Sequence, residues 1–357
     1  MDTSEVDFLI VGQGLAGSLL AWHLMERGRR VLVIDDNHAT SSSRVAAGLV
    51  NPLAGMRFNA HPRTAEWLAG MHRTYDEIAR TLRTAPYFHS VPMRRLFRSP
   101  EQQRFYRRQR ENPAAQPYLA EPFGPDEAGS LLRAPHGGFW QRETGYVTLP
   151  RLLGDLRAWL RHRGALRIEP LPFDRLAIDT DGIRMGMVRA RHLVFCEGYR
   201  VRSNPWFDWL PLQPDKGEIL RLETSQPLGR EIVNGAHWLV PLAEGGYRFG
   251  ATHGHRQIDC RPTPEGRSRL EQGLGQLLSD VQGIEITEHQ AGVRPATPDR
   301  SALLGSHPQM PRLHVFNGFG ARGALSIPWH AGRMSDYLDQ GTALPSEVDV
   351  ARWSNRR

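Results

Sequence analysis

The sequence predicts an α/β protein in which a mainly parallel sheet is interleaved with antiparallel sheet, and three observations predict this class. Short apolar runs typical of buried parallel strands occur near the start, in the middle and near the end of the chain. Segments with helical spacing of apolar residues lie between these runs. Residues 219–288 instead contain alternating apolar and polar positions, which are typical of antiparallel strands. With 357 residues, the chain is long enough for two domains.

The N-terminal segment predicts one β-α-β unit. Residues 8–12 form an apolar run that ends in glycine, as expected for a buried strand. Residues 15–27 have helical spacing, and Gly28 follows them where helices commonly end with glycine. Residues 31–34 form a second buried strand, which completes a unit of the expected length.

The rest of the chain adds further predicted elements. They are a helix over residues 64–83, a helix over 149–164, a strand over 191–198, a strand over 313–316 and a helix over 325–338. Residues 86–135 are rich in proline and arginine and show no single period. Parallel strands are therefore expected at the start, in the middle and at the end of the chain, with antiparallel strands inserted between them.

A glycine-rich motif, Gly-Gln-Gly-Leu-Ala-Gly at residues 12–17, joins the first strand to the first helix. The spacing G-x-G-x-x-G permits a tight turn, close approach of a pyrophosphate and close helix–strand packing. An acidic residue that binds the ribose is expected roughly 20 residues later. The motif therefore predicts a dinucleotide site, rather than a glycine-rich turn of another kind, formed by Gly12, Gly14, Leu15, Ala16, Gly17, Asp35 and Asp36. It does not distinguish NAD from FAD.

The segment after Asp36 does not continue into a second mononucleotide-binding half, as a nicotinamide enzyme would. Residues 41–52, Ser-Ser-Ser-Arg-Val-Ala-Ala-Gly-Leu-Val-Asn-Pro, are mostly small. Small side chains would let the backbone approach a flat ring and donate N–H groups to it. The same residues would suit an ordinary surface loop equally well, so this physical argument leaves the choice open.

Residues 45–52 resemble the flavin-contacting loop of the D-amino-acid oxidase and glycine oxidase family of FAD-dependent oxidoreductases. Further segments resemble the family in order along nearly the whole chain: 193–198, 211–218, 237–241, 249–252, 291–299 and 317–325. Cys196 and Glu197 depart from the Ala-Thr that usually precedes the glycine found here as Gly198. These motifs are specific for the superfamily and not for one substrate.

The resemblance implies a Rossmann-like FAD-binding domain of the glutathione-reductase type, formed by residues 1–82, 145–213 and 292–357. Residues 83–144 and 214–291 would form a substrate domain built on a mainly antiparallel sheet. FAD would be bound non-covalently, because no cysteine near Gly292 could form the covalent link of monomeric sarcosine oxidase. The resemblance further implies contacts to FAD from Ser43, Arg44, Ala46, Ala47, Gly48, Leu49, Cys196, Glu197, Gly198, Gly318, Phe319, Gly320, Ala321, Arg322, Gly323 and Ala324.

The resemblance also implies a substrate pocket, in which no residue is assigned to acid or base catalysis. Arg294 would bind a substrate carboxylate, because a guanidinium group presents two parallel N–H donors. Arg322, just before the last helix, would contact the substrate or the cofactor. Trp238 and His237 occupy the position of an aromatic wall, and strand alternation lets only one of them face inward. The remaining predicted substrate-binding residues are His253 and Asn51.

The implied reaction oxidises the C–N bond of a small amine or amino acid, by hydride transfer to flavin N5 and hydrolysis of the resulting imine. One alternative is a flavin-dependent tRNA-modification oxidoreductase that acts on a carboxymethylaminomethyl-modified wobble base. The basic segment 93–110 could then contact phosphates, although a solvated helix face is the usual explanation for such a run. A flavoprotein without activity and a nicotinamide dehydrogenase are two further alternatives.

The composition excludes few classes of protein. The net charge of +7 comes almost wholly from arginine, since Lys216 is the only lysine, and total charge alone does not indicate a nucleic-acid partner. Cys196 and Cys260 lie far apart, so we expect neither a disulfide scaffold nor a metal site. The start of the chain lacks the basic region of a signal peptide, and no apolar run approaches the ~20 residues of a membrane span. We therefore expect a cytoplasmic protein with a small-molecule substrate and no nucleic-acid partner.

Overall fold

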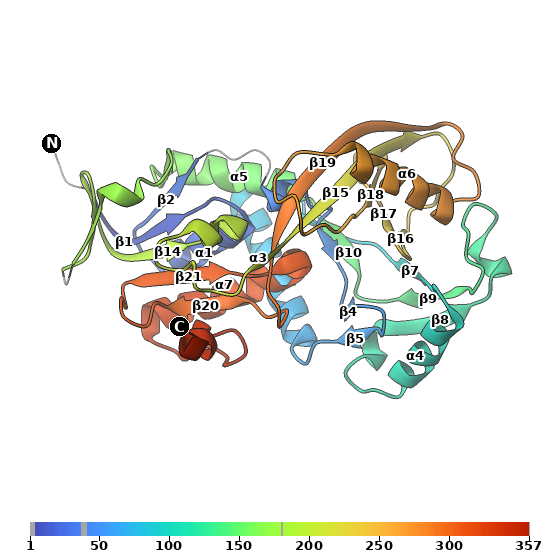
Figure 1. Cartoon of the computed structure of the whole chain (residues 1–357), viewed down its shortest axis with the longest axis horizontal. Helices are drawn as coiled ribbons and strands as arrows, with labels where there is room; N and C mark the ends of the chain where they lie inside the picture. Colours follow the sequence, from blue (N-terminus) through green and yellow to red (C-terminus); the bar gives the residue numbers. More distant parts are fainter. Residues whose placement is uncertain (1–3, 37–40, 180, 357) are drawn as a thin grey trace.

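Two large sheets of eight strands each occupy the two halves of the molecule, a computed structural model (Figure 1). The structure describes residues 4–36, 41–179 and 181–356. None of the described helices combines the length and the apolar character that crossing a bilayer requires.

The first sheet contains the predicted parallel strands. Its order is β11 (Leu166–Ile168), β2 (Val31–Asp35), β1 (Ser4–Val11), β14 (Val188–Phe195), β13 (Ile183–Met185) and β12 (Leu176–Ile178), and β21 (Leu313–Asn317) pairs with β14 and with β20 (Leu303–Ser306). The pairs β11–β2, β2–β1, β1–β14 and β14–β21 are parallel. Because parallel strands end at the same edge, the loops after β1, β2, β14 and β21 open on one side of the sheet.

Helices cover one face of this sheet, and they are α1 (Leu15–Glu26), α3 (Thr64–Leu82), α5 (Leu149–His162) and α7 (Gly323–Gln340). Phe8 and Ile10 of β1 point into the core beneath these helices, whereas the neighbouring Leu9 and Val11 point into a core on the opposite face. The strand is therefore buried on both faces, which explains its uninterrupted apolar run. Gly28 directly follows the cap of α1 and has a φ of 75°, as its predicted role at the helix end requires.

The second sheet is mainly antiparallel, as the sequence predicts. Its order is β19 (Ile284–Ala296), β15 (Gln213–Thr224), β18 (Tyr247–Gly250), β17 (Trp238–Pro241), β16 (Ile232–Asn234), β7 (Met93–Leu96), β9 (Gly138–Gln141) and β8 (Leu119–Phe123). Only the β16–β7 pair is parallel among these described strands. Helix α6 (Pro264–Leu277) packs on one face, and α4 (Pro100–Arg110) lies near β8 at the far end of the molecule (Figure 1).

Short elements account for most differences from the sequence prediction. The segment without a single period, 86–135, contributes β7, β8, α4 and β6 (Phe88–Ser90). Strand β6 pairs with β10 (Gly145–Val147), which also pairs with β3 (Leu49–Val50), and β4 (Leu53–Ala54) pairs with β5 (Asn59–Ala60). Strands of two to four residues are too short for an alternating period to emerge. The strand predicted over 191–198 covers 188–195 instead, because the chain leaves the sheet after Phe195.

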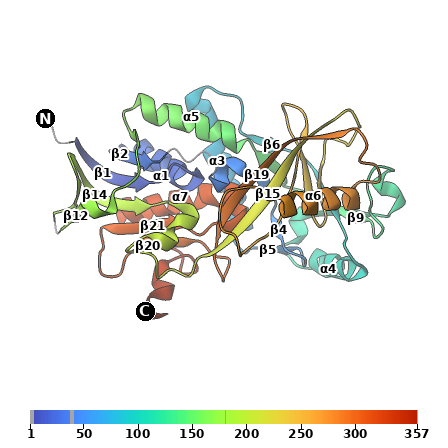
Figure 2. The same cartoon turned by 45° about the horizontal axis from the view of Figure 1, so that its top comes forward.

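Strands β15 and β19 link the two halves of the molecule (Figure 2). They pair along nearly their whole lengths, from Gln213 opposite Ala296 to Thr224 opposite Ile284. The predicted domain boundaries at 213/214 and 291/292 fall within these strands. The strands of the first sheet come from residues 1–82, 145–213 and 292–357, and the exact division into two domains stays a prediction.

Candidate active site

A cavity of about 1560 Å³ is lined by residues of both sheets. Its wall includes the loops after the parallel strands, the segment 41–49 and the cavity-facing side of β15, β17 and β19. This volume exceeds the range of ~300–1,000 Å³ that is usual for one small ligand. The cavity therefore has room for a large cofactor together with a substrate.

The glycine-rich turn between β1 and α1 forms one end of this cavity. Gly12, Gly14, Leu15 and Ala16 line the wall. Gly17 does not, because it packs so closely that a Cβ atom there would lie 1.9 Å from the Gly12 carbonyl oxygen. Gly14 is the N-cap of α1 and gives no side-chain cap; the Leu15 N–H donates to Ser43 Oγ at 3.1 Å, and the other N–H groups of the first turn can face an anion.

The two predicted ribose-binding aspartates also line the cavity. Asp35 Oδ1 accepts a hydrogen bond from the Gln13 backbone N–H at 3.0 Å, and Asp35 Oδ2 accepts one from Arg157 Nη1 at 3.0 Å. Asp36 pairs with Arg200. A carboxylate has about four lone-pair sites, so each aspartate can accept further hydrogen bonds.

The segment predicted to contact a flat ring also lines the cavity. Ser43 lies in the short helix α2 (Ser42–Val45), and the next residues of the wall, Ala46, Ala47, Gly48 and Leu49, follow this helix. Gly48 has a φ of 70°, and a Cβ atom there would lie 2.0 Å from the Val147 carbonyl oxygen, so only glycine fits. Arg44 is among the predicted cofactor contacts, but its side chain is exposed and lies outside the cavity wall. The turn of α2 directs this side chain to solvent, and a contact between Arg44 and FAD stays a prediction.

The loop after β14 places Cys196, Glu197 and Gly198 in the wall. Burial raises the pKa of the Cys196 thiol well above its usual range, and the nearby Glu197 adds to this effect. Burial also raises the pKa of Glu197 to about 7, although the hydrogen bond from Asn204 and the charge of Arg200 oppose the shift. Asn204 Nδ2 donates that bond to Glu197 Oε2 at 2.8 Å.

The loop between β21 and α7 completes this part of the cavity, and its lining residues are Gly318, Phe319, Gly320, Ala321, Arg322, Gly323 and Ala324. The Arg322 guanidinium lies over the Trp67 ring at 5.1 Å and donates to the Arg300 carbonyl oxygen at 3.3 Å. Burial lowers the pKa of Arg322, with a smaller contribution from Arg300. The structure thus brings the predicted cofactor loops together around one space.

Arg294 lines the cavity but already has a carboxylate partner. Arg294 Nη1 donates to Asp215 Oδ2 at 2.8 Å, and its contacts to the Thr252 carbonyl oxygen are long, at 3.4 and 3.5 Å. His253 Nδ1 lies 2.7 Å from the same Asp215 oxygen. Burial alone would raise the pKa of Asp215, but the His253 hydrogen bond and the Arg294 charge together lower it. Arg294, the residue predicted to bind a substrate carboxylate, therefore forms an ion pair with Asp215 inside the protein.

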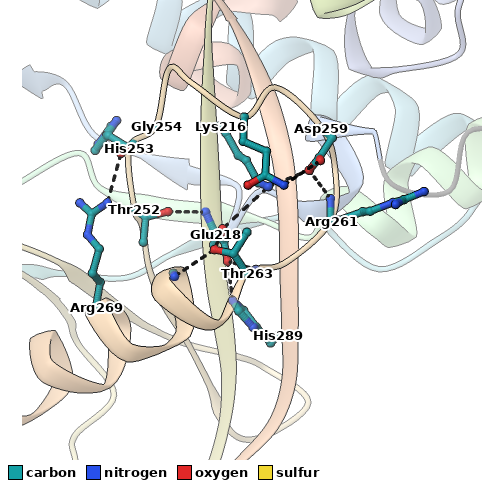
Figure 3. Close-up of polar contacts among 12 residues, drawn as sticks. Lys216, Glu218, Thr252, His253, Gly254, Asp259, Arg261, Thr263, Arg269 and His289 are labelled. Carbon is teal, nitrogen blue, oxygen red and sulfur yellow. Dashed lines mark hydrogen bonds and ion pairs between the residues drawn. The ribbon is translucent and has the colours of Figure 1, made fainter.

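The segment that follows His253 is held by side chains on the face of β15 that points away from the cavity (Figure 3). Asp215, Gly217 and Ile219 face the cavity, and strand alternation directs Lys216 and Glu218 away from it. Lys216 Nζ lies 2.7 Å from Asp259 Oδ1, while Glu218 accepts hydrogen bonds from the Thr263 hydroxyl at 2.8 Å and backbone N–H at 2.9 Å. This buried cluster ties residues 259 and 263 to the sheet.

Alternation along the extended chain also separates Trp238, the first residue of β17, from His237, which directly precedes this strand. Trp238 faces the cavity, as does the predicted Asn51, whose Oδ1 accepts from Gln141 Nε2 at 2.6 Å. His237 does not line the cavity; its ring lies 5.3 Å from that of Phe249 and packs against Gly273 of α6. Of the two residues Trp238 takes the inward position, and a contact between either residue and the substrate stays a prediction.

The cavity-lining residues that the sequence does not predict include Arg95 of β7 and Asn234 of β16. Arg95 belongs to the basic segment 93–110, for which a solvated helix face is the usual explanation. That explanation fits α4, in which Arg104, Arg107, Arg108 and Arg110 are exposed. Arg95 instead follows Met93 at strand spacing in a buried strand, a pattern that identifies it only once β7 is recognised.

Comparison with known proteins defines the class of the chain. Residues 7–337 match the family model DAO, described as FAD dependent oxidoreductase. The chain belongs to this family. The predicted family, α/β fold, FAD cofactor and oxidoreductase class are confirmed. The glycine cradle at residues 12–17 and 48 and the glycine at the N-terminus of α1 fit this cofactor.

Several particular relatives are similar along most of the chain. Glycine oxidase of Pseudomonas aeruginosa is 23% identical over 92% of this chain and 94% of its own length. Bifunctional protein ThiO/ThiG of Nostoc sp. is 25% identical over 95% of this chain, and the tRNA 5-methylaminomethyl-2-thiouridine biosynthesis bifunctional protein MnmC of Maricaulis maris is 28% identical over 96%. These matches each cover 53% of the two bifunctional proteins, so the chain spans about half of their length.

Solved structures confirm the fold. Glycine oxidase from Geobacillus kaustophilus superposes with a TM-score of 0.83 at 22% identity, covering 99% of this chain and 98% of that one. Iminodiacetate oxidase from Chelativorans sp. gives a TM-score of 0.77 at 23% identity, covering 97% of this chain and 98% of that one.

Proposed function

We propose that the C–N bond which this FAD-dependent oxidoreductase oxidises belongs to a small amine or amino acid. The observation that carries the proposal is the continuity of one cavity from the glycine-rich turn to the inner face of the antiparallel sheet. A cofactor bound along the first part would leave the second part for a substrate. Relatives named glycine oxidase, and a similar structure named iminodiacetate oxidase, support an amino-acid substrate.

Residues of the first part would hold FAD non-covalently. The turn at 12–17 and the N-terminus of α1 would hold the pyrophosphate, and Asp35 would accept hydrogen bonds from the ribose. Residues 46–49 and the loop 318–324 would surround the ring system. Bound FAD would supply the acceptor for the hydride that leaves the carbon next to nitrogen. The high pKa of the Cys196 thiol disfavours a thiolate there, which supports non-covalent binding.

Residues of the second part would bind and orient the substrate. Trp238 offers an apolar wall, and Arg322 offers a guanidinium group without an acidic partner among the described residues. Oxidation of a neutral amine by hydride transfer needs its reacting carbon held in place rather than an acid–base pair. Orientation is therefore the main contribution of these side chains.

Anaerobic reduction of the FAD-loaded protein by a panel of amines and amino acids tests the proposal. We expect the flavin absorbance to bleach with glycine, N-methylglycine, proline or another amino acid of one configuration. A chemical reductant serves as the control for a functional flavin. Bleaching by the reductant but by no amine or amino acid would contradict the proposal.

A second candidate function is oxidation of a modified tRNA base, supported by the 28% identity to the tRNA-modifying relative. One feature of this structure favours it. Helix α4 packs against the cavity-lining segment 54–60, because Gln109 Nε2 donates to the Arg57 carbonyl oxygen at 3.0 Å and to Asn59 Oδ1 at 2.7 Å. The exposed arginines of α4 could contact phosphates beside the cavity. Salt-dependent binding of bulk tRNA, lost when Arg104, Arg107 and Arg108 are changed to glutamine, would support this alternative.

A further inference from the structure

Arg95 is a buried arginine in the cavity wall without an acidic partner among the described residues. Its side chain is only 9% exposed. Arg95 Nη2 donates to the Gly55 carbonyl oxygen at 3.0 Å, and the guanidinium lies 5.3 Å from the centre of the Phe58 ring. These contacts engage one of its five N–H donors in a hydrogen bond. The charged neighbour that shifts the pKa of Arg95 is another cation, Arg98, which lowers it.

The neighbouring Arg94 on the same strand differs from Arg95, because it has an acidic partner in the protein. Arg94 points to the opposite face of β7, where Nη2 lies 2.9 Å from Glu231 Oε1 and Nη1 donates to the Ala128 carbonyl oxygen at 2.7 Å. Its guanidinium also stacks on Trp140 at 5.0 Å. Arg94 is thus neutralised by the protein and Arg95 is not.

Strand register places Arg95 in a row of cavity-lining residues. Arg95 is opposite Asn234 of β16, and Asn234 is opposite Trp238 of β17. All three line the cavity. The Asn234 amide has no hydrogen-bond partner among the described residues, so its N–H groups can join those of Arg95 in binding one ligand.

The row ends far from Arg294, measured across the sheet. Strand β7 is five places from β19, the strand of Arg294, in the sheet order. At ~4.8 Å per strand, this is about 24 Å along the curved sheet. An α-amino acid carries its amine and carboxylate on one carbon, within roughly the 3.8 Å length of one residue. Arg95 is therefore too far from Arg294 for both arginines to bind the α-carboxylate of one amino acid, and it is positioned for another part of a substrate whose α-carboxylate is held at Arg294.

A buried charge without a counterion is costly, and proteins rarely retain one that serves no purpose. Burial lowers the pKa of Arg95 to about 10, so the group keeps its proton near neutral pH while lacking the compensation that an anion would give. Such a perturbed group in a cleft is characteristic of binding sites. A carboxylate or phosphate group would supply the missing partner through charge-assisted hydrogen bonds.

We propose that Arg95, assisted by Asn234, binds an anionic group that is remote from the C–N bond undergoing oxidation. The substrate is accordingly an amine or amino acid with a second, distal acid group, either carboxylate or phosphate. This inference rests on the proposed oxidation of a C–N bond, and it selects a substrate class within it.

Pairs of ligands that differ only in the distal charge test the proposal on the FAD-loaded protein. The pairs are aspartate and asparagine, glutamate and glutamine, and O-phosphoserine and serine, each in both configurations. Dissociation constants come from perturbation of the flavin absorbance under anaerobic conditions. We expect wild-type protein to bind the charged member of at least one pair about ten- to a hundredfold more tightly, as charge-assisted hydrogen bonds predict. The carboxylate and phosphate pairs distinguish the two possible acids.

The variants Arg95→Met and Arg94→Met separate binding from a structural role. Arg95→Met should abolish the preference by weakening binding of the charged member far more than binding of the neutral member, and Arg95→Lys should retain part of the preference. Arg94→Met, on the opposite face, should retain the preference. Without ligand, Arg95→Met should unfold at the same or a higher temperature than wild type, because it removes an uncompensated buried charge. A purely structural Arg95 would instead lower this temperature.

Equal binding of charged and neutral members by wild type, or a preference that survives Arg95→Met, would overturn the proposal. Because these constants measure binding, they are informative even when a ligand does not reduce the flavin. If no amine or amino acid reduces the flavin, the proposed function fails, whereas the binding comparison still decides the role of Arg95.

Discussion

Arg294 Nη1 and Asp215 Oδ2 lie 2.8 Å apart on neighbouring strands, where the two residues are direct cross-strand partners. The Arg294 guanidinium also covers Gly217, because a Cβ atom at that glycine would come within 2.1 Å of Nη2. The arginine that the family resemblance assigns to a substrate carboxylate is thus held against the sheet by a carboxylate of the protein itself. This pairing weakens its attraction for an external anion.

Replacing Asp215 by asparagine should release Arg294 for external carboxylates. Asparagine keeps an oxygen that can accept from the Gly254 backbone N–H, which donates to Asp215 Oδ1 at 3.2 Å. We expect the dissociation constant of acetate, measured by flavin perturbation, to fall about tenfold, which corresponds to ~1.4 kcal/mol. Weaker acetate binding would mean that Asp215 positions Arg294 for the substrate rather than competing with it.

Trp238 and His237 form a matched pair for testing which face of β17 meets the substrate. Trp238→Leu should raise KM about tenfold, because it removes aromatic contact area from the cavity wall, with a smaller effect on kcat. His237→Leu should leave KM unchanged, since that ring packs against α6. An increase in KM for His237→Leu as large as that for Trp238→Leu would contradict the assigned orientation of the strand.

Glu197 should make stability depend on pH near neutrality. Burial, opposed by Asn204 and Arg200, raises its pKa from 4.5 to about 7, so the folded state holds a proton that the unfolded state releases between these values. The free energy of unfolding should therefore fall as pH rises from 4.5 to 7, by up to about 3 kcal/mol. Glu197→Gln should remove this component, as urea unfolding at about pH 5 and about pH 8 would reveal. An identical pH dependence in the variant would disprove the raised pKa.

Gly48 and Gly154 should respond oppositely to alanine. Gly48→Ala places a Cβ atom 2.0 Å from the Val147 carbonyl oxygen and forces alanine to a φ of 70°. We expect this variant to lose more than about 2 kcal/mol of stability and to bind FAD more weakly. Gly154 lies exposed within α5, and a Cβ atom there would meet no other atom within 4 Å, so Gly154→Ala should gain about 0.5–1 kcal/mol. Calorimetry that showed the same change in stability for both variants would contradict the steric restriction at Gly48.

The sequence predicts the parts of the site that depend on neighbouring residues. The turn at 12–17 and the aspartates after β2 belong to one β-α-β unit, whose strand, helix and glycine signals lie within about 30 residues. Burial on both faces explains the apolar runs at residues 8–11 of β1 and 193–195 of β14, so these strands are recognisable without the rest of the fold.

Features that depend on distant residues could not be predicted in the same way. Asp215 and Arg294 are 79 positions apart, and only the pairing of β15 with β19 brings them together. Arg95 lies in a four-residue strand, too short to reveal which of two adjacent arginines faces inward. The outward direction of the Arg44 side chain follows from the single helical turn 42–45, which the sequence did not predict.

The most direct test of the proposed function is a titration of the purified protein with FAD, followed by anaerobic addition of the amino-acid panel. We predict a flavin spectrum that remains with the protein after gel filtration and bleaches with an amino acid of one configuration, most readily one that carries a distal acid group. A protein that retains no FAD, or whose flavin is reduced by dithionite but by no amine, amino acid or modified tRNA, would contradict this prediction.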